Sequence, residues 1–197
     1  MTNDHHIRSK LRDKVVGIAG CGGLGSNCAV ALARVGVGKL IIADFDIVDQ
    51  SNLNRQYFFS DQVGMPKVHA LKENIARIDQ GISVLGYEIT LNAGNIPLIF
   101  GSCDVIVEAF DKADMKQMII ETVMEKMKGK YLVCGSGLAG WGDNDLIKVK
   151  SFDNIFICGD MENEVSDEFP PLAPRVGIVA CMEANLVLEI LLGKMKH

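Results

Sequence analysis

Long apolar segments are missing from this 197-residue chain. It contains no run of eighteen apolar residues, and its start, MTNDHHIRSKLRDK, has no apolar stretch. A membrane-spanning helix needs about twenty apolar residues, and a secretory leader needs a shorter apolar core. We therefore expect a cytoplasmic protein without a membrane span. Repeats, low-complexity tracts and linkers are also missing, so the sequence predicts one domain over residues 1–197.

Paired cysteines are missing as well, because no two of the six cysteines form a C-x-x-C motif. In a cytosolic chain, this spacing favours reduced thiols over a disulfide framework or a four-cysteine zinc site. We expect no zinc. The adjacent His5 and His6 lie in an N-terminal segment that we expect to be mobile and solvated.

Positive charge is not in excess, since the formal net charge is −5. An acidic balance without a Lys/Arg cluster disfavours non-specific nucleic-acid binding, and no nucleic-acid partner is expected. The hydrophobic fraction of 48% is ordinary for a globular α/β protein.

Strand and helix patterns alternate over the first 136 residues, which predicts an α/β, Rossmann-like, doubly wound and mostly parallel sheet. After Gly140 the pattern changes to an antiparallel C-terminal extension, followed by a final helix. The expected strands are 14–19, 40–44, 83–88, 104–110, 131–136, 146–152 and 154–159. The expected helices are 26–35, 66–78, 113–127 and 175–192.

A G-x-G-x-x-G turn joins the first strand to the first helix. Gly20 permits a tight turn, Gly22 lets the backbone approach a phosphate, and Gly25 lets the helix pack close to the strand. Free N–H groups at the helix start then attract phosphates. Asp44 ends the second strand, where it is placed to bind ribose hydroxyls. Together these residues predict a nucleotide site.

Two cations follow the ribose acid, and they argue against a simple dinucleotide enzyme. Arg55 and Lys67 are not needed for a pyrophosphate already held by a helix start, but they suit the charge on a transferring phosphoryl or adenylyl group. Asp111 follows the fourth strand, where a carboxylate beside ATP is suited to holding Mg²⁺. No later strand ends in a histidine with a carboxylate partner, which disfavours an NAD-dependent dehydrogenase. A catalytically silent binding module is disfavoured because all three residues are present.

Several characteristic segments are spread over most of the chain. They are GCGGLGSN, DFDIVDQSNLNRQYF, GMPKVHAL, EAFDKAD and, as a further match, PPLAPRVG. They resemble the ThiF/MoeB family of adenylyltransferases, which are related to ubiquitin-activating enzymes. The S-N-L-x-R-Q string is far more selective than the glycine motif. The chain is most similar to the short ThiF type that serves thiamine biosynthesis.

The resemblance implies that a ubiquitin-like sulfur carrier protein ending in Gly-Gly is adenylated at its C-terminus by MgATP, with release of pyrophosphate. By position, Asp44 would hold the ribose, Asn52 and Arg55 the phosphates, Lys67 the transition-state charge, and Asp111 the magnesium, with Lys112 beside it. The resemblance thus implies a nucleotide-binding set formed by Gly20, Gly22, Gly23, Gly25, Asp44, Asn52, Arg55, Lys67 and Lys112.

Three points remain open at this stage. Arg8 or Arg12 could reach the ATP of a second subunit, as an N-terminal arginine does in the family, which implies a homodimer. Cys158 stands where the strand 154–159 meets the loop over 158–174, and a strand-end residue is the favoured interpretation. It is expected not to act in covalent catalysis, because its acidic surroundings would raise the pKa of the thiol. The alternative substrates are a carboxylate on a modified tRNA adenosine and a molybdopterin-type sulfur carrier.

Overall fold

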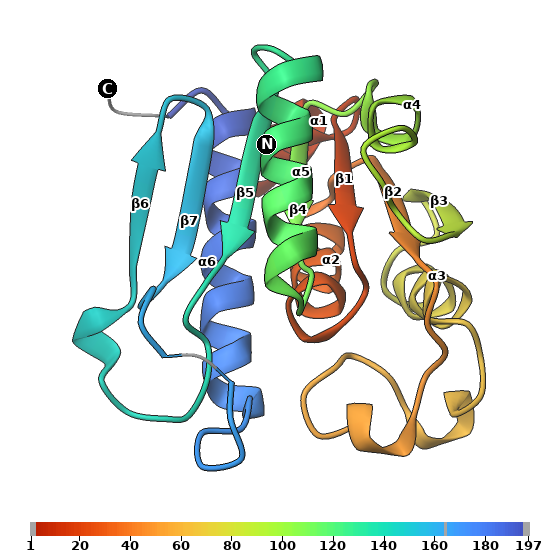
Figure 1. Cartoon of the computed structure of the whole chain (residues 1–197). Coiled ribbons are helices and arrows are strands. Elements are labelled where there is room, and N and C mark those ends of the chain that lie inside the picture. Colours follow the sequence, from red (N-terminus) through yellow and green to blue (C-terminus); the bar gives the residue numbers. More distant parts are fainter. Residues whose placement is uncertain (1–2, 164, 195–197) are drawn as a thin grey trace.

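The structure is a computed structural model that describes residues 3–163 and 165–194. Its seven strands lie in one sheet of order β3-β2-β1-β4-β5-β7-β6, in which only β6 runs antiparallel to its neighbour (Figure 1). The strands are β1 (Val15–Ala19), β2 (Lys39–Asp44), β3 (Ser83–Glu88), β4 (Val105–Glu108), β5 (Tyr131–Gly135), β6 (Lys148–Phe152) and β7 (Ile155–Gly159). The predicted Rossmann-like sheet with an antiparallel extension is confirmed.

Six helices flank this sheet, together with three short 3-10 turns among the described residues. The helices are α1 (Asn3–Leu11), α2 (Gly23–Val35), α3 (Lys67–Ile78), α4 (Ile96–Phe100), α5 (Ala113–Lys126) and α6 (Ala173–Leu191). The turns are η1 (Gln50–Asn52), η2 (Ser60–Gln62) and η3 (Asn144–Leu146). None of the described helices combines the length and the apolar character that crossing a membrane requires.

Two apolar cores form because alternate side chains of the central strands point to opposite faces of the sheet. On one face, Ile18 and Ile42 pack with residues of α2, α3 and α6. On the other face, Ile41 and Ile106 pack with residues of α4 and α5. Figure 1 shows the resulting three layers, with α5 in front of the sheet and α2 and α6 behind it. Burial on both faces explains why these strands are continuous apolar runs in the sequence.

The structure differs from the sequence predictions in three places. The N-terminal segment is not a mobile tail: residues 3–11 form α1, which ends in the fully buried Leu11. A short helix, α4, precedes β4 and was not predicted. Helix α2 begins three residues earlier than expected, because the glycines at its start already adopt helical geometry.

Parallel strands direct their C-terminal ends to one edge of the sheet, the lower edge in Figure 1. That edge carries the glycine turn after β1, Asp44 at the end of β2 and the 109–112 segment after β4. The pairing Ala19↔Ala43 and Ala19↔Glu108 brings these three chain segments side by side. Ligands of open α/β sheets bind at such an edge.

Candidate nucleotide site and the adjoining loop edge

The turn between β1 and α2 requires glycine at two positions. Gly20 has φ +97°, and a Cβ there would lie 2.8 Å from the Ala109 carbonyl oxygen. A Cβ at Gly25 would lie 1.9 Å from the Gly20 carbonyl oxygen, so any side chain would push α2 away from β1. Gly22, at the N-cap of α2, has no such conflict, since the nearest heavy atom to its Cβ position would be Gln56 Nε2 at 3.9 Å. The open space above Gly22 is suited to a phosphate.

Asp44 ties the end of β2 to the glycine turn. Its Oδ2 accepts a 2.6 Å hydrogen bond from the Cys21 N–H, and its Oδ1 accepts one of 2.8 Å from the Asp46 N–H. Burial raises the pKa of Asp44, and these two hydrogen bonds oppose the shift. Each carboxylate oxygen keeps a second lone pair, so the side chain can still accept hydrogen bonds from hydroxyl groups of a ligand.

Lys67 is buried at the start of α3 and is not a solvated surface lysine. Its side chain is 7% exposed, and its Nζ lies 2.7 Å from Asp46 Oδ2. The Lys67 N–H also donates to the Asp46 carbonyl oxygen. The ammonium group has three donors, so two remain available for an anion.

The segment that contains Asn52 and Arg55 docks on the start of α2. Asn27 Nδ2 donates to the carbonyl oxygens of Gly23 and Arg55, at 2.7 and 2.9 Å. Arg55 Nη1 donates to Asn54 Oδ1 and to the Ser51 carbonyl oxygen. Asn52 Oδ1 accepts from the Asp49 N–H in a capping box, which leaves the Asn52 amide NH₂ for other acceptors. The predicted cation Arg55 is thereby held next to the glycine turn.

Asp111 and Lys112 lie beyond β4, where both are exposed. Asp111 makes no hydrogen bond or ion pair with the described part of the chain, and it does not cap α5, whose N-cap residue is Lys112. The segment is close to the glycine turn, because Ala109 and Phe110 are the nearest neighbours of the Gly20 Cβ position.

The structure also places two further residues that the sequence analysis named. Cys158 lies in β7, as the favoured strand-end interpretation had it; it is fully buried, and burial raises the pKa of its thiol. Arg8 packs against Gly36 and donates to the Arg34 carbonyl oxygen, at the end of α2 opposite the glycine turn. Within one chain, helix α1 therefore carries Arg8 away from the candidate site.

Several residues that position this edge were missed by the sequence analysis. Asp46 holds Lys67, and Lys116 binds both carboxylate oxygens of the buried Glu108 as well as the Gly135 carbonyl oxygen. The D-x-D spacing of Asp44 and Asp46 is a signal that could have identified the first pair. No local signal identifies the second, because its residues are eight positions apart in different elements.

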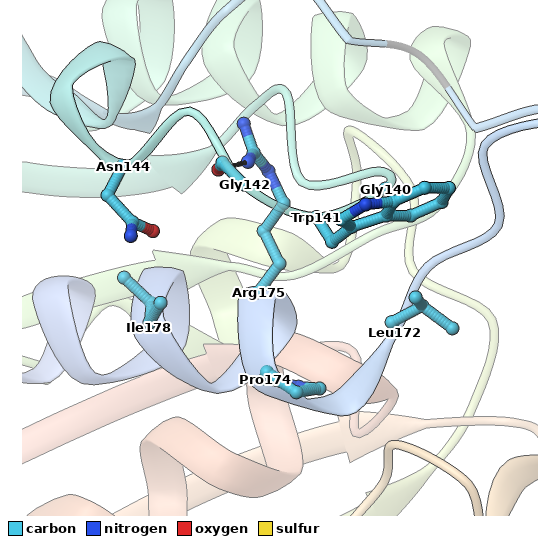
Figure 2. A pocket seen from close by; sticks show the side chains of 8 residues that line it. All are labelled: Gly140, Trp141, Gly142, Asn144, Leu172, Pro174, Arg175 and Ile178. Atoms are coloured by element: carbon cyan, nitrogen blue, oxygen red, sulfur yellow. Dashed lines mark hydrogen bonds between the residues drawn. The ribbon is translucent and has the colours of Figure 1, made fainter.

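The loops after β5 and β7 form the rest of the same edge, and a buried ion pair joins them. Arg175, at the start of α6, binds Asp160 Oδ2 through Nη2. Through Nη1 it donates to the Gly142 carbonyl oxygen (Figure 2). Asp160 also accepts from the backbone N–H groups of Glu162 and Asn163. A cavity of about 90 Å³ lies beside this pair, between α6 and the loop that carries Trp141.

No group of three His, Cys, Asp or Glu side chains suited to a metal ion is found among residues 3–163 and 165–194. The absence of zinc therefore stays a prediction. Mg²⁺ commonly uses only one or two carboxylates together with phosphates and water, so the lack of a larger cluster among these residues does not count against the predicted role of Asp111.

The strand order, the glycine turn and the acid at the end of β2 define a Rossmann-like α/β protein with a candidate nucleotide site. The chain belongs to the ThiF family, which matches residues 3–197. Among curated proteins, it is 34% identical over 185 residues to the adenylyltransferase and sulfurtransferase UBA4 of Eremothecium gossypii, covering 93% of this chain. The chain spans only 39% of the length of that relative.

Solved structures share the fold. The E. coli tRNA N6-threonylcarbamoyladenosine dehydratase TcdA, in complex with AMP, superposes with a TM-score of 0.87 at 20% identity, covering 96% of this chain and 90% of TcdA. E. coli MccB, solved with ATP, gives a TM-score of 0.74 at 22% identity, covering 96% of this chain and 59% of MccB. At these identities, the likeness establishes the fold alone.

Proposed function

We propose that the chain is an ATP-dependent adenylyltransferase that activates the C-terminal Gly-Gly carboxylate of a ubiquitin-like sulfur carrier protein. The observation that carries the proposal is the anchoring of two cations, Arg55 and Lys67, beside a glycine turn whose strand-end acid is Asp44. Family membership and the name of the UBA4 relative, an adenylyltransferase, support it. Within this class, we propose a ThiS-like carrier of thiamine biosynthesis as the first candidate, and a molybdopterin-type carrier as the second.

In this proposal, ATP lies across the C-terminal ends of β1 and β2. The N–H groups of Gly22 and Gly23 at the start of α2 face the phosphates, since the first N–H groups of a helix lack intrahelical acceptors. Asp44 accepts hydrogen bonds from the ribose hydroxyls. Asn52 offers its free amide NH₂ to a phosphate oxygen. The likeness to structures solved with AMP and with ATP is in keeping with this placement.

The proposed reaction forms one bond and breaks one. A carboxylate oxygen of the substrate attacks the α-phosphorus, and the bond from that phosphorus to the bridging oxygen of the β-phosphate breaks. Pyrophosphate takes the electron pair and leaves, and the acyl-adenylate remains. Arg55 and the two free donors of Lys67 stabilise the negative charge that spreads over the phosphate oxygens, which is usually the largest contribution in such chemistry.

Asp111 is the residue proposed to hold Mg²⁺, with Lys112 next to the phosphates. The exposed carboxylate of Asp111 has no competing partner among the described residues, which fits a hard oxygen ligand for this ion. Bound there, Mg²⁺ supplies neutralisation of charge on the phosphates.

A homodimer is also part of the proposal. Because α1 lies at the opposite end of α2 from the glycine turn in its own chain, Arg8 or Arg12 would have to act on the site of a second subunit. Analytical ultracentrifugation with and without ATP would test this assembly.

The proposed function is tested by ATP–pyrophosphate exchange with Mg²⁺ and a purified carrier protein, compared with the same carrier lacking its terminal Gly-Gly. We expect exchange only with the intact carrier. Exchange supported instead by a tRNA that carries a carboxylate-modified adenosine would favour the tRNA alternative, towards which the likeness to TcdA points. Binding of NAD but not of ATP would contradict adenylation altogether.

A further inference from the structure

The acidic character of the chain is concentrated in one region. Residues 136–175 contain eight Asp and Glu residues but only three Lys and Arg residues, whereas the rest of the chain contains seventeen of each. The formal net charge of −5 therefore belongs to the loops after β5 and β7, together with the β6–β7 hairpin. Arg175 and Asp160 are buried against each other and cancel, so the acidic surplus belongs to the other residues of this region.

The pocket beside Arg175 lies within this region and has mostly apolar walls. Figure 2 shows Trp141, Leu172, Pro174 and Ile178 around the aliphatic part of Arg175. Its volume of about 90 Å³ is enough for about three water molecules, or for one small aliphatic side chain.

Two exposed apolar residues extend the pocket towards solvent. Trp141 is 67% exposed and stacks on Phe169, with 6.2 Å between the ring centroids. Ile178 is 44% exposed on the outer face of α6. Large apolar side chains gathered at a hollow mark an interaction site more often than scattered ones do.

A buried hydrogen-bond donor beside the pocket also lacks an acceptor among the described residues. Arg175 is 3% exposed, and its Nη1 and Nη2 are bound, but its Nε–H has no acceptor among the described residues. An unpaired buried N–H costs free energy, which an entering carbonyl oxygen would recover. A peptide backbone brings such an oxygen next to every side chain.

Exposed carboxylates border the pocket. Asp143 and Asp145 flank the pocket residue Asn144, and Asp167 and Glu168 directly precede Phe169. We call these four acids the acidic rim. The first turn of α6, which carries Arg175, also contacts the glycine turn, because a Cβ at Gly23 would lie only 3.0 Å from Cγ1 of Val176.

We propose that the pocket and the acidic rim bind an extended segment of the polypeptide substrate, upstream of the carboxylate that is adenylated. One small aliphatic side chain fills the pocket against Trp141 and Ile178, and a lysine or arginine beside it faces the acidic rim. This inference rests on the proposed function and specifies its substrate as a polypeptide with a basic and aliphatic segment. The same rim repels the phosphates of RNA, so the polypeptide is favoured over tRNA as the occupant.

The experiment uses the single tryptophan of the chain, Trp141, as a reporter inside the pocket. Two synthetic decapeptides ending in Gly-Gly are titrated in turn into the protein. Each contains one valine. Two lysines stand next to the valine in the first peptide (the Lys-Lys peptide), and two glutamates stand next to it in the second. We expect the Lys-Lys peptide to shift the Trp141 emission to shorter wavelength and to bind about tenfold more tightly at low salt. The preference should shrink in 0.5 M NaCl, because exposed charges are screened.

Two variants locate the binding. Ile178→Ser should weaken the Lys-Lys peptide about tenfold by removing part of the apolar wall without changing the charge, a loss typical of a central interface residue. Leu98→Ser is the matched control, because Leu98 is 85% exposed on α4, away from the pocket, and it should change nothing. Asp143→Asn with Asp145→Asn should reduce the preference for the Lys-Lys peptide.

The proposed peptide binding and the proposed adenylation can be contradicted independently of each other. Equal affinity for the two peptides, no emission shift, or an unchanged affinity in Ile178→Ser would overturn the pocket assignment even if pyrophosphate exchange succeeds. A tRNA that shifts the Trp141 emission more strongly than the Lys-Lys peptide, and loses this effect in Ile178→Ser, would assign the pocket to RNA instead. Peptide binding as predicted without any exchange would leave the pocket in place and reject adenylation.

Discussion

Two regions share the C-terminal edge of the sheet, and they are held in place by different means. In the nucleotide region (residues 20–25, 44–67 and 108–112), short side chains such as Asp44 and Asn27 hydrogen-bond to backbone groups of neighbouring segments. In the loop region (residues 136–147 and 160–175), one buried ion pair, Arg175–Asp160, joins three segments. The ion pair of the first region, Lys67–Asp46, leaves the Asp46 side chain 48% exposed and is supported by many such bonds, whereas the pair that joins the loops is buried on both sides.

The largest effect should come from breaking that pair. Asp160→Asn leaves the Arg175 charge buried without its counter-charge, so we expect the free energy of unfolding to fall by about 3–5 kcal/mol. Urea denaturation checks this, with Glu162→Gln, an exposed acid of the same loop, as the control. A loss no larger than that of the control would mean that the loop region does not depend on the pair.

The dependence of the free energy of unfolding on pH in the acid range tests the same ion pair. Burial alone would raise the pKa of Asp160, but hydrogen bonds from Asn163, Glu162 and Arg175 lower it to about 2. Because the folded-state pKa is depressed, the stabilisation is complete above the ordinary value of 3.8 and is lost as the pH falls through about 2. The Asp160→Asn variant should lack this acid-dependent loss.

In the nucleotide region, a single change should affect chemistry more than folding. Lys67→Ala removes a cation proposed to stabilise the transition state, so pyrophosphate exchange should fall about 10²–10³-fold. Lys72→Ala, which removes an exposed lysine from the same helix, should leave exchange unchanged. Peptide binding at Trp141 should survive in both variants. Full exchange in Lys67→Ala would contradict the role given to this residue.

The smallest effect should come from Glu183 of α6, which lies between the two regions. The carboxylate is fully buried beside Gly135, and neither of its oxygens has a hydrogen-bond partner among the described residues. Burial, and then the nearby Glu108, raise the pKa of Glu183, whereas Lys116 opposes the shift. The folded state therefore keeps a proton that the unfolded chain releases above the ordinary pKa of 4.5.

The resulting stabilisation is complete below pH 4.5 and declines as the pH rises. Glu183→Gln should flatten this decline between pH 5 and pH 8, as measured by urea unfolding at several pH values. Glu189→Gln, on the same helix but partly exposed, should keep the wild-type slope. Parallel slopes for Glu183→Gln and the wild type would show that Glu183 does not hold this proton.

The sequence predicted the glycine turn between β1 and α2 and the position of Asp44 at the end of β2, because the signals for both are local. The glycine spacing and the apolar strand before it reflect short-range steric demands, as the close approach of Gly25 to Gly20 illustrates. The partner of Lys67 escaped notice because Asp46 is twenty-one residues away. Helix α1 was wrongly expected to be mobile, because its ordering depends on distant contacts, such as that of Arg8 with the Arg34 carbonyl oxygen.

The loop region could not be predicted in the same way. Arg175 meets Asp160 and Gly142 across fifteen and thirty-three residues, with no periodicity to relate them. Cys158, by contrast, was expected at the end of its strand, because the apolar run NIFIC is a local signal. The roles of Arg55, Asp111 and the other site residues in catalysis remain predictions, since geometry alone does not measure them.

The contact of Val176 with the glycine turn has a thermodynamic consequence. Arg175 lines the pocket and the next residue packs at Gly23, so the first turn of α6 links the nucleotide site to the proposed peptide pocket. We therefore expect the two ligands to be coupled, and such coupling is reciprocal: the factor by which ATP changes the affinity for peptide equals the factor by which peptide changes the affinity for ATP.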